Sequence, residues 1–109
     1  MMKRTPWWYL SLYGLLILAG VPLVFQLVPP NRWYGFRLPG AMVSPEAWFQ
    51  INALGGKLLI ASMVFCAGLN LLMLIPSTDR LRPYLGWINL ALIVLSFWIV
   101  SRLLLEHLP

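Results

Sequence analysis

Three long stretches without any charged residue constrain this chain more than any other feature. They run from Thr5 to Asn31, from Leu58 to Thr78 and from Pro83 to Ser101, and they contain 27, 21 and 19 residues. A helix needs about 20 apolar residues to span a hydrocarbon core about 30 Å thick. Each stretch is long enough, so the sequence predicts three transmembrane helices.

The overall composition supports a membrane protein. Of the 109 residues, 61% are hydrophobic and only 10% are charged, whereas soluble domains contain about 25% charged residues. We therefore expect an all-α membrane protein with one domain over residues 1–109. The expected spans are about 7–28, 53–75 and 85–105, and a folded interfacial loop occupies residues 29–52.

The scarcity of reactive side chains bears on catalysis. The chain contains one cysteine, Cys66, one histidine and three acidic residues. Metal clusters and catalytic triads need several such groups, and Glu46 with His107 makes a poor acid and base pair. We therefore expect no enzymatic activity, no metal, no cofactor and no nucleic-acid partner.

The segment between the first two predicted spans differs from the rest, because turn-forming, aromatic and charged residues are concentrated in it. Backbone groups in lipid need hydrogen-bond partners, so this segment is predicted to fold compactly at the membrane interface. Gly35 and Pro39-Gly40 are typical of turns. The candidate recognition residues are Asn31, Arg32, Tyr34, Gly35, Arg37, Pro39, Ser44, Glu46, Trp48, Asn52, Gly56 and Lys57.

Ser44-Pro45-Glu46 is the start signal of a helix. A serine hydroxyl caps free N–H groups, proline suits the first helical position, and a carboxylate is favoured at the positive end of the helix dipole. We predict a short interfacial helical segment over residues 45–52 that leads directly into the second span.

The charged residues of this loop allow two interpretations. Arg37 offers a five-donor fork for a carboxylate or phosphate, and it could equally pair with Glu46, the only acidic residue of the loop. Lys57 either snorkels to the headgroups or binds an anion below the loop. The surrounding aromatic rings are either interfacial belt residues or part of a binding surface.

Polar residues inside the predicted spans indicate helix packing. Asn70 lies six residues before Pro76 and Asn89 six residues after Pro83, so the two amides should reach a similar depth on facing helices. Interhelical hydrogen bonds of this kind join membrane helices, and we favour such a contact over a transport site. The predicted packing residues are Ser62, Asn70, Asn89 and Ser96.

The orientation in the membrane rests on the basic residues. Three crossings place four Lys and Arg residues on each side: Lys3, Arg4, Arg80 and Arg82 against Arg32, Arg37, Lys57 and Arg102. Charges held in a folded loop or at span ends count less toward the positive-inside rule. On this basis we predict a cytoplasmic amino terminus and an extracytoplasmic loop.

The spacing of the loop residues resembles the signature of the SdpI family of bacterial integral-membrane proteins. The pattern comprises Asn31, Tyr34-Gly35-Phe36-Arg37-x-Pro39, Ser44-x-Glu46-x-Trp48, Asn52 and Gly56, and the resemblance extends over residues 15 to 105. It implies a multi-pass protein of the bacterial cytoplasmic (inner) membrane. The namesake is an immunity protein against a secreted killing peptide that also retains a transcriptional repressor at the membrane.

Two classes of function follow from these observations. In the first, the protein is an immunity, recognition or signalling factor whose loop meets a peptide toxin, an anionic lipid or another membrane protein. In the second, it is a structural accessory subunit of a larger membrane complex. Membrane lipids are partners in either case, and a homo-oligomer and a hetero-complex both remain open.

Overall fold

The computed structural model describes residues 6–31 and 33–107. Helices dominate this part of the chain: α1 (Trp7–Val24), the 3-10 helix η1 (Pro39–Met42), α2 (Pro45–Leu72), the 3-10 helix η2 (Pro76–Tyr84) and α3 (Leu85–Glu106). The described residues include no strand, and three helices are long and apolar enough to cross a membrane. The predicted all-α, three-span class is confirmed, and the chain is a multi-pass membrane protein.

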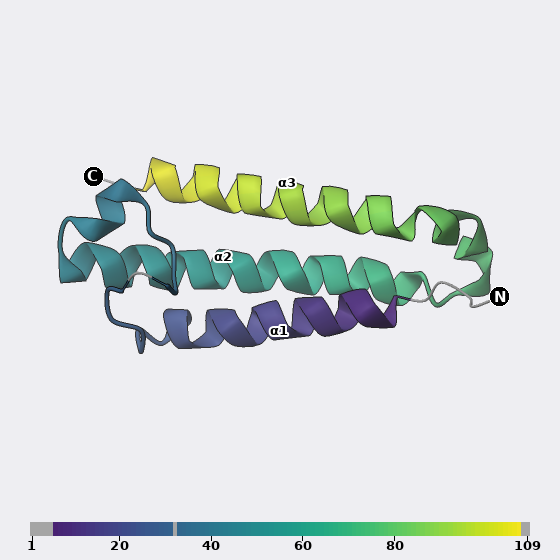
Figure 1. The fold of residues 1–109 in the computed structure, drawn as a ribbon, viewed down its shortest axis with the longest axis horizontal. Coiled ribbons are helices and arrows are strands. Elements are labelled where there is room, and N and C mark those ends of the chain that lie inside the picture. The colour runs from purple at the N-terminus through teal and green to yellow at the C-terminus, as the bar shows by residue number, and fades with distance from the viewer. Residues whose placement is uncertain (1–5, 32, 108–109) are drawn as a thin grey trace.

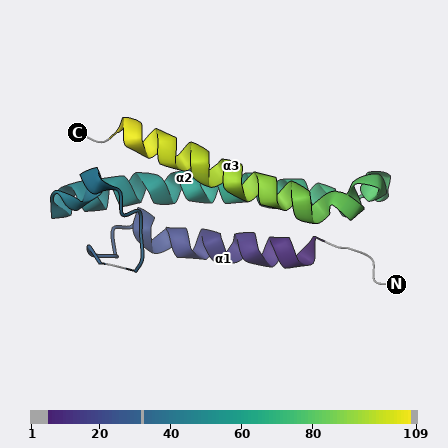
Figure 2. The same cartoon turned by 45° about the horizontal axis from the view of Figure 1, so that its top comes forward.

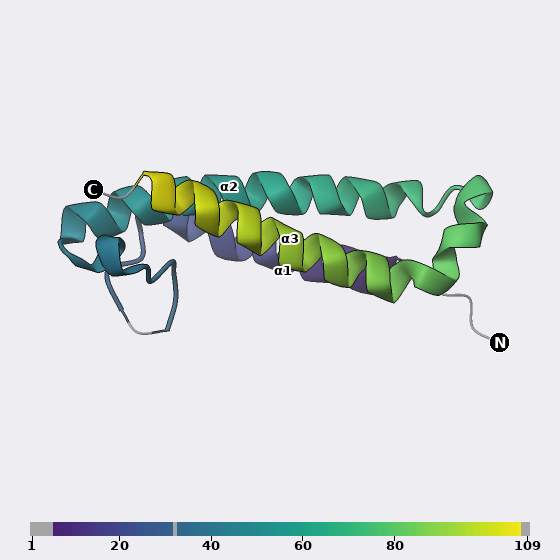
Figure 3. The ribbon, with the colours of Figure 1, turned by 90° about the horizontal axis from the view of Figure 1, so that it is seen from above.

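The three α-helices form an elongated antiparallel bundle measuring 52 × 23 × 19 Å. In Figure 1, α2 lies between α1 and α3. Seen from above in Figure 3, α3 runs obliquely, so that it overlies α2 near the carboxyl terminus and α1 further along its length. The loop between α1 and α2 therefore lies at the same end of the bundle as the carboxyl end of α3.

The first helix ends at Val24 and not at residue 28, as the apolar run had suggested. Gln26 adopts a left-handed backbone with φ 58°, and the Leu27 N–H donates to the Pro22 carbonyl over 2.9 Å. This is the 6→1 bond of a Schellman stop. Glycine and asparagine usually occupy that left-handed position, so Gln26 gave no recognisable stop signal.

The second helix is one continuous element that includes both the interfacial segment and the span. It begins where predicted, because the Ser44 hydroxyl accepts the Ala47 N–H over 3.0 Å. Its 28 residues extend about 42 Å at 1.5 Å per residue, which exceeds a hydrocarbon core of about 30 Å. It ends at Leu72 and not at residue 75, because the bonds of Met73, Leu74 and Ile75 tighten to the i−3 pattern before Pro76.

Helices α1 and α2 approach each other closely where two glycines face each other. A Cβ placed on Gly56 would lie 2.9 Å from the Gly20 carbonyl oxygen, and one placed on Gly20 would lie 3.0 Å from the Ile60 side chain. Small residues at a crossing let membrane helices approach with their backbones nearly in contact. Gly56 therefore fixes the position of α1 along α2.

A buried hydrogen-bond network joins all three helices. Asn70 donates to the Asn89 side-chain oxygen over 2.8 Å, and Asn89 donates back to the Asn70 oxygen over 3.1 Å. The sequence predicted this contact. The Tyr13 hydroxyl of α1 also donates to the Asn89 oxygen, a partner that sequence reasoning missed.

The two serines predicted for helix packing have different surroundings. The Ser96 hydroxyl lies 3.5 Å from the Cys66 sulfur and so joins α3 to α2. The Ser62 hydroxyl donates to the Leu58 carbonyl of its own helix over 2.8 Å. Of these two serines, Ser96 makes the polar contact between helices and Ser62 bonds within α2.

Candidate functional site

The loop between α1 and α2, residues 25–44, folds back against the bundle at the carboxyl end of α3, as Figures 1 and 2 show. Phe36 is the point of attachment. Its ring packs against the cluster of Tyr13, Leu59, Met63 and Cys66 and also against the cluster of Ala41, Ile51, Val100 and Leu104. The loop is thus anchored in the core of the bundle.

Asn31 shapes the first turn of this loop. Its side-chain oxygen accepts the N–H groups of Trp33 and Tyr34 over 2.8 and 2.6 Å, and its side-chain nitrogen donates to the Pro29 carbonyl over 2.8 Å. An asparagine that bonds its own following backbone forms an Asx turn. Asn31 therefore directs the chain from the end of α1 back toward α2.

Asn52 holds the second turn from α2. Its side-chain oxygen accepts the Phe36 N–H, and its nitrogen donates to the carbonyls of Phe36 over 3.3 Å and Trp48 over 2.9 Å. Only 2% of Asn52 is exposed. Because both backbone groups of Phe36 find partners in one side chain, the loop enters an apolar region without unpaired polar atoms.

The glycines at this contact are required by space and by backbone geometry. Gly35 has φ +117°, and a Cβ there would lie 2.7 Å from the Asn52 oxygen and 2.9 Å from the Trp48 ring. A Cβ on Gly55 would lie 2.5 Å from the Phe36 ring. Gly35 allows the turn, and Gly55 leaves the space that the Phe36 ring fills.

Two aromatic side chains tie the loop to α2 and to α1. The Trp48 ring N–H donates to the Val28 carbonyl over 2.8 Å, and Trp48 is fully buried. The Tyr34 hydroxyl donates to the Ala19 carbonyl. Asn31, Tyr34, Gly35, Trp48 and Asn52 therefore maintain the shape of the loop.

The charged candidates lie on the outside of this framework. Arg37, Glu46 and Lys57 are exposed, while Arg32 lies outside the described residues. Arg37 makes contacts within the protein, and its predicted pairing with Glu46 stays a prediction. Trp33 of the loop is 92% exposed.

A cavity of about 320 Å³ opens where the loop meets α1 and α3. Leu23 of α1, Phe36 and Arg37 of the loop, and Phe97 and Ser101 of α3 contribute to its lining. Its walls are mostly apolar, and Arg37 is the one ionisable cation among the lining residues. The cavity therefore suits a molecule with an apolar body and an anionic group.

Potential metal ligands and acidic side chains are dispersed among the described residues. Within residues 6–31 and 33–107, no three His, Cys, Asp or Glu side chains are placed to hold a metal ion. The Asp79 carboxylate lies 2.9 Å from Arg82, but this ion pair belongs to η2 at the opposite end of the bundle. The arrangement at the loop is suited to binding.

Sequence reasoning identified most of the residues that build the loop but assigned several of them to recognition. Asn31, Tyr34, Trp48 and Asn52 bond within the protein, and Ser44 caps α2. The anchoring role of Phe36 was missed. The Gly55-Gly56 doublet was the available signal, because it leaves room on α2 for both an aromatic ring and a neighbouring helix.

Comparison with known proteins gives a family match. The model of the SdpI/YfhL protein family matches residues 28–104, which include most of the loop, all of α2 and nearly all of α3. No curated protein and no solved structure matches this chain.

Proposed function

Because this chain belongs to the SdpI/YfhL protein family, we propose that it is a recognition factor of the immunity type in the bacterial cytoplasmic membrane. In this proposal the loop faces the extracytoplasmic side and binds an amphipathic peptide that carries a carboxylate. The protein performs no chemistry on the peptide. The protein acts by binding the peptide, so that the peptide cannot reach the membrane or another target.

The observation that carries this proposal is the position of Arg37 in the lining of an apolar cavity. A guanidinium group binds a carboxylate through two parallel charge-assisted hydrogen bonds. The apolar walls, to which Phe36 and Phe97 contribute, suit the hydrophobic side chains of the same ligand. Together these features favour a ligand with a charged end and an apolar body.

The rigidity of the loop also supports a binding role. Asn31 and Asn52 hold the backbone on both sides of Gly35 through five hydrogen bonds to Pro29, Trp33, Tyr34 and Phe36. A site that is already ordered loses less conformational entropy when a ligand binds. Arg37 is thus presented from a fixed backbone.

The proposal is tested with synthetic amphipathic helical peptides, each made with either a free carboxyl terminus or an amidated one. Binding is measured to the full-length protein in lipid nanodiscs. We expect the carboxylate form to bind at least about tenfold more tightly, since hydrogen bonds to charged groups contribute about 1.5–3 kcal/mol. Arg37→Gln should abolish this preference, and Arg37→Lys should retain part of it.

Arg80→Gln is the matched control, because it removes one positive charge from η2 at the other end of the molecule. It should leave the preference unchanged. Equal binding of both peptide forms by the unaltered protein would contradict the proposal. If a foreign subunit instead co-purified at fixed stoichiometry in mild detergent, the protein would be an accessory subunit of a larger complex.

A further inference from the structure

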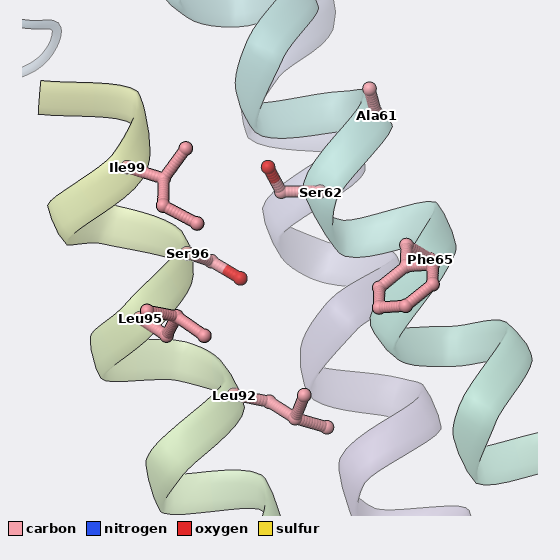
Figure 4. Close-up of a pocket in the computed structure, with 7 residues that line it drawn as sticks. All are labelled: Ala61, Ser62, Phe65, Leu92, Leu95, Ser96 and Ile99. Carbon is pink, nitrogen blue, oxygen red and sulfur yellow. The ribbon is translucent and has the colours of Figure 1, made fainter. Parts of the chain in front are cut away.

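A second hollow lies on the surface of the bundle, between α2 and α3. Figure 4 shows Ala61, Ser62 and Phe65 of α2 facing Leu92, Leu95, Ser96 and Ile99 of α3 across it. Its volume is about 310 Å³. It shares no lining residue with the cavity beside Arg37, so the two sites are separate.

The walls of this groove have little capacity for specific polar contacts. The Ser62 hydroxyl already donates to Leu58, and the Ser96 hydroxyl lies within 3.5 Å of the Cys66 sulfur. The remaining lining side chains are apolar. Leu92, Leu95 and Ile99 follow one face of α3 from residue 92 to residue 99, about 10 Å of helix. The groove therefore fits a hydrocarbon chain better than a polar ligand.

One basic residue lies beyond each wall of the groove, at the same end. Lys57 lies one helical turn before Ala61 on α2, and Arg102 lies three residues after Ile99 on α3. Because the helices are antiparallel, both steps lead toward the end of the bundle that carries the loop. Residues i, i+3 and i+4 share a helix face, so each cation continues the face that forms its wall.

The packing of neighbouring residues places the two cations at similar depth. Leu58, next to Lys57, packs against the cluster that contains Val100 and Leu104, which flank Arg102. Lys57 and Arg102 are both exposed. Among the described residues neither has a carboxylate within ion-pair distance, and Arg102 lies over the Trp98 ring with its central carbon 5.9 Å from the ring centroid.

We propose that this groove binds an anionic phospholipid, with one acyl chain between α2 and α3 and the phosphate between Lys57 and Arg102. The positive charges of Lys57 and Arg102 favour an anionic lipid in the groove over a neutral lipid or a second copy of the chain. A second copy would bring further Lys57 and Arg102 cations to a surface that is already positive. Tryptophan is enriched at the headgroup level of bilayers, and Trp98 beside Arg102 lies where that level is expected.

The test is competitive lipid retention by the full-length protein. The protein is purified in mild detergent with equal amounts of dioleoyl phosphatidylglycerol and dioleoyl phosphatidylcholine, and bound lipids are identified by native mass spectrometry. Each basic residue near a bilayer surface contributes about a fivefold preference for anionic lipid. We expect phosphatidylglycerol to be retained at least about tenfold over phosphatidylcholine. Lys57→Gln and Arg102→Gln should each reduce the ratio, and the double variant should bring it close to one.

Matched variants separate the groove from general effects of charge and size. Arg80→Gln removes a charge at the other end and should keep the full ratio. Ala61→Phe fills the groove and should lower lipid retention, whereas Ala91→Phe, on the exposed surface of α3 outside the groove, should not. Equal retention of the two lipids by the unaltered protein would overturn the proposal. An unchanged lipid ratio in the double variant would also overturn the proposal. So would a dimer of the unaltered protein that Ala61→Phe dissociates without changing the lipid ratio.

Discussion

At the scale of single residues, asparagine side chains provide hydrogen bonds to polar groups that water would satisfy in a soluble protein. Asn52 satisfies both backbone groups of Phe36, and Asn70 and Asn89 satisfy each other between two spans. An amide in an apolar region is favourable only when its donors and acceptors find partners. The fold therefore depends on each of these asparagines together with its hydrogen-bond partners.

The network at Asn89 gives a prediction about coupling. Asn89→Leu removes the acceptor of Tyr13 and both bonds to Asn70, so it should destabilise the protein by about 1–3 kcal/mol. Tyr13→Phe removes only one of these bonds and should cost less. Unfolding in detergent, followed by circular dichroism, measures both variants.

The double variant Asn70→Leu/Asn89→Leu provides the control for this network. It leaves fewer amide groups without partners than either single change, so its cost should be smaller than the sum of the two single costs. Strict additivity would show that the two amides act independently.

Gly35 allows a second prediction at this scale. Gly35→Ala places a Cβ against Asn52 at a positive φ, so it should destabilise the loop by about 1–3 kcal/mol. Gly14→Ala is the matched control, because nothing lies within 4 Å of a Cβ at Gly14, and it should change stability by less than about 1 kcal/mol. Thermal unfolding of both variants in the same detergent makes the comparison. Equal losses of stability in Gly35→Ala and Gly14→Ala would mean that the turn at Gly35 does not require glycine.

At the scale of elements, the crossing of α1 and α2 depends on Gly56. Gly56→Ala would bring a methyl group to 2.9 Å from the Gly20 carbonyl oxygen, so the helices would have to separate. Overpacking of this kind costs about 1–3 kcal/mol. Gly68→Ala, on the same helix with nothing within 4 Å, should be tolerated. A disulfide introduced across the α1–α2 interface should form more slowly in Gly56→Ala than in Gly68→Ala, and equal rates would refute the crossing role.

The elements also show what sequence patterns can and cannot determine. The long uncharged runs and the Ser44 signal predicted three helices and the start of α2, because these depend on local composition and capping. The end of α1 was not predictable in this way, since it depends on a left-handed Gln26. Tyr13 was missed as a partner of Asn89 because 76 residues separate them, and no local pattern reports the depth of a hydroxyl on another helix.

Sequence patterns predicted one part of the candidate site and not another. Spacing identified which residues belong to the loop, since turn and cap residues have local signatures. It did not distinguish residues that hold the loop from residues that face outward. That distinction depends on burial: Trp48 and Asn52 are at most 2% exposed, whereas Arg37 and Glu46 lie on the surface.

At the scale of the whole molecule, the bundle has two chemically different ends. One end carries the loop, Arg37, Lys57 and the carboxyl end of α3, and the other carries η2 with Asp79, Arg80 and Arg82. The amino end of α1 belongs to the second end, because a Cβ on Gly86 would lie 3.4 Å from the Tyr9 hydroxyl. Lys3 and Arg4, which entered the orientation argument, lie outside the described residues.

The orientation of these two ends yields the last prediction, which uses single cysteines and a membrane-impermeant thiol reagent in intact cells. Met42 is 46% exposed at the loop end and Ser77 is exposed in η2, while the native Cys66 is buried and should stay unlabelled. If the positive-inside rule retains the basic residues of η2 in the cytoplasm, Met42→Cys should react in intact cells and Ser77→Cys only after permeabilisation. The reverse pattern would place the loop and Arg37 in the cytoplasm, where a secreted peptide could not reach them without crossing the membrane.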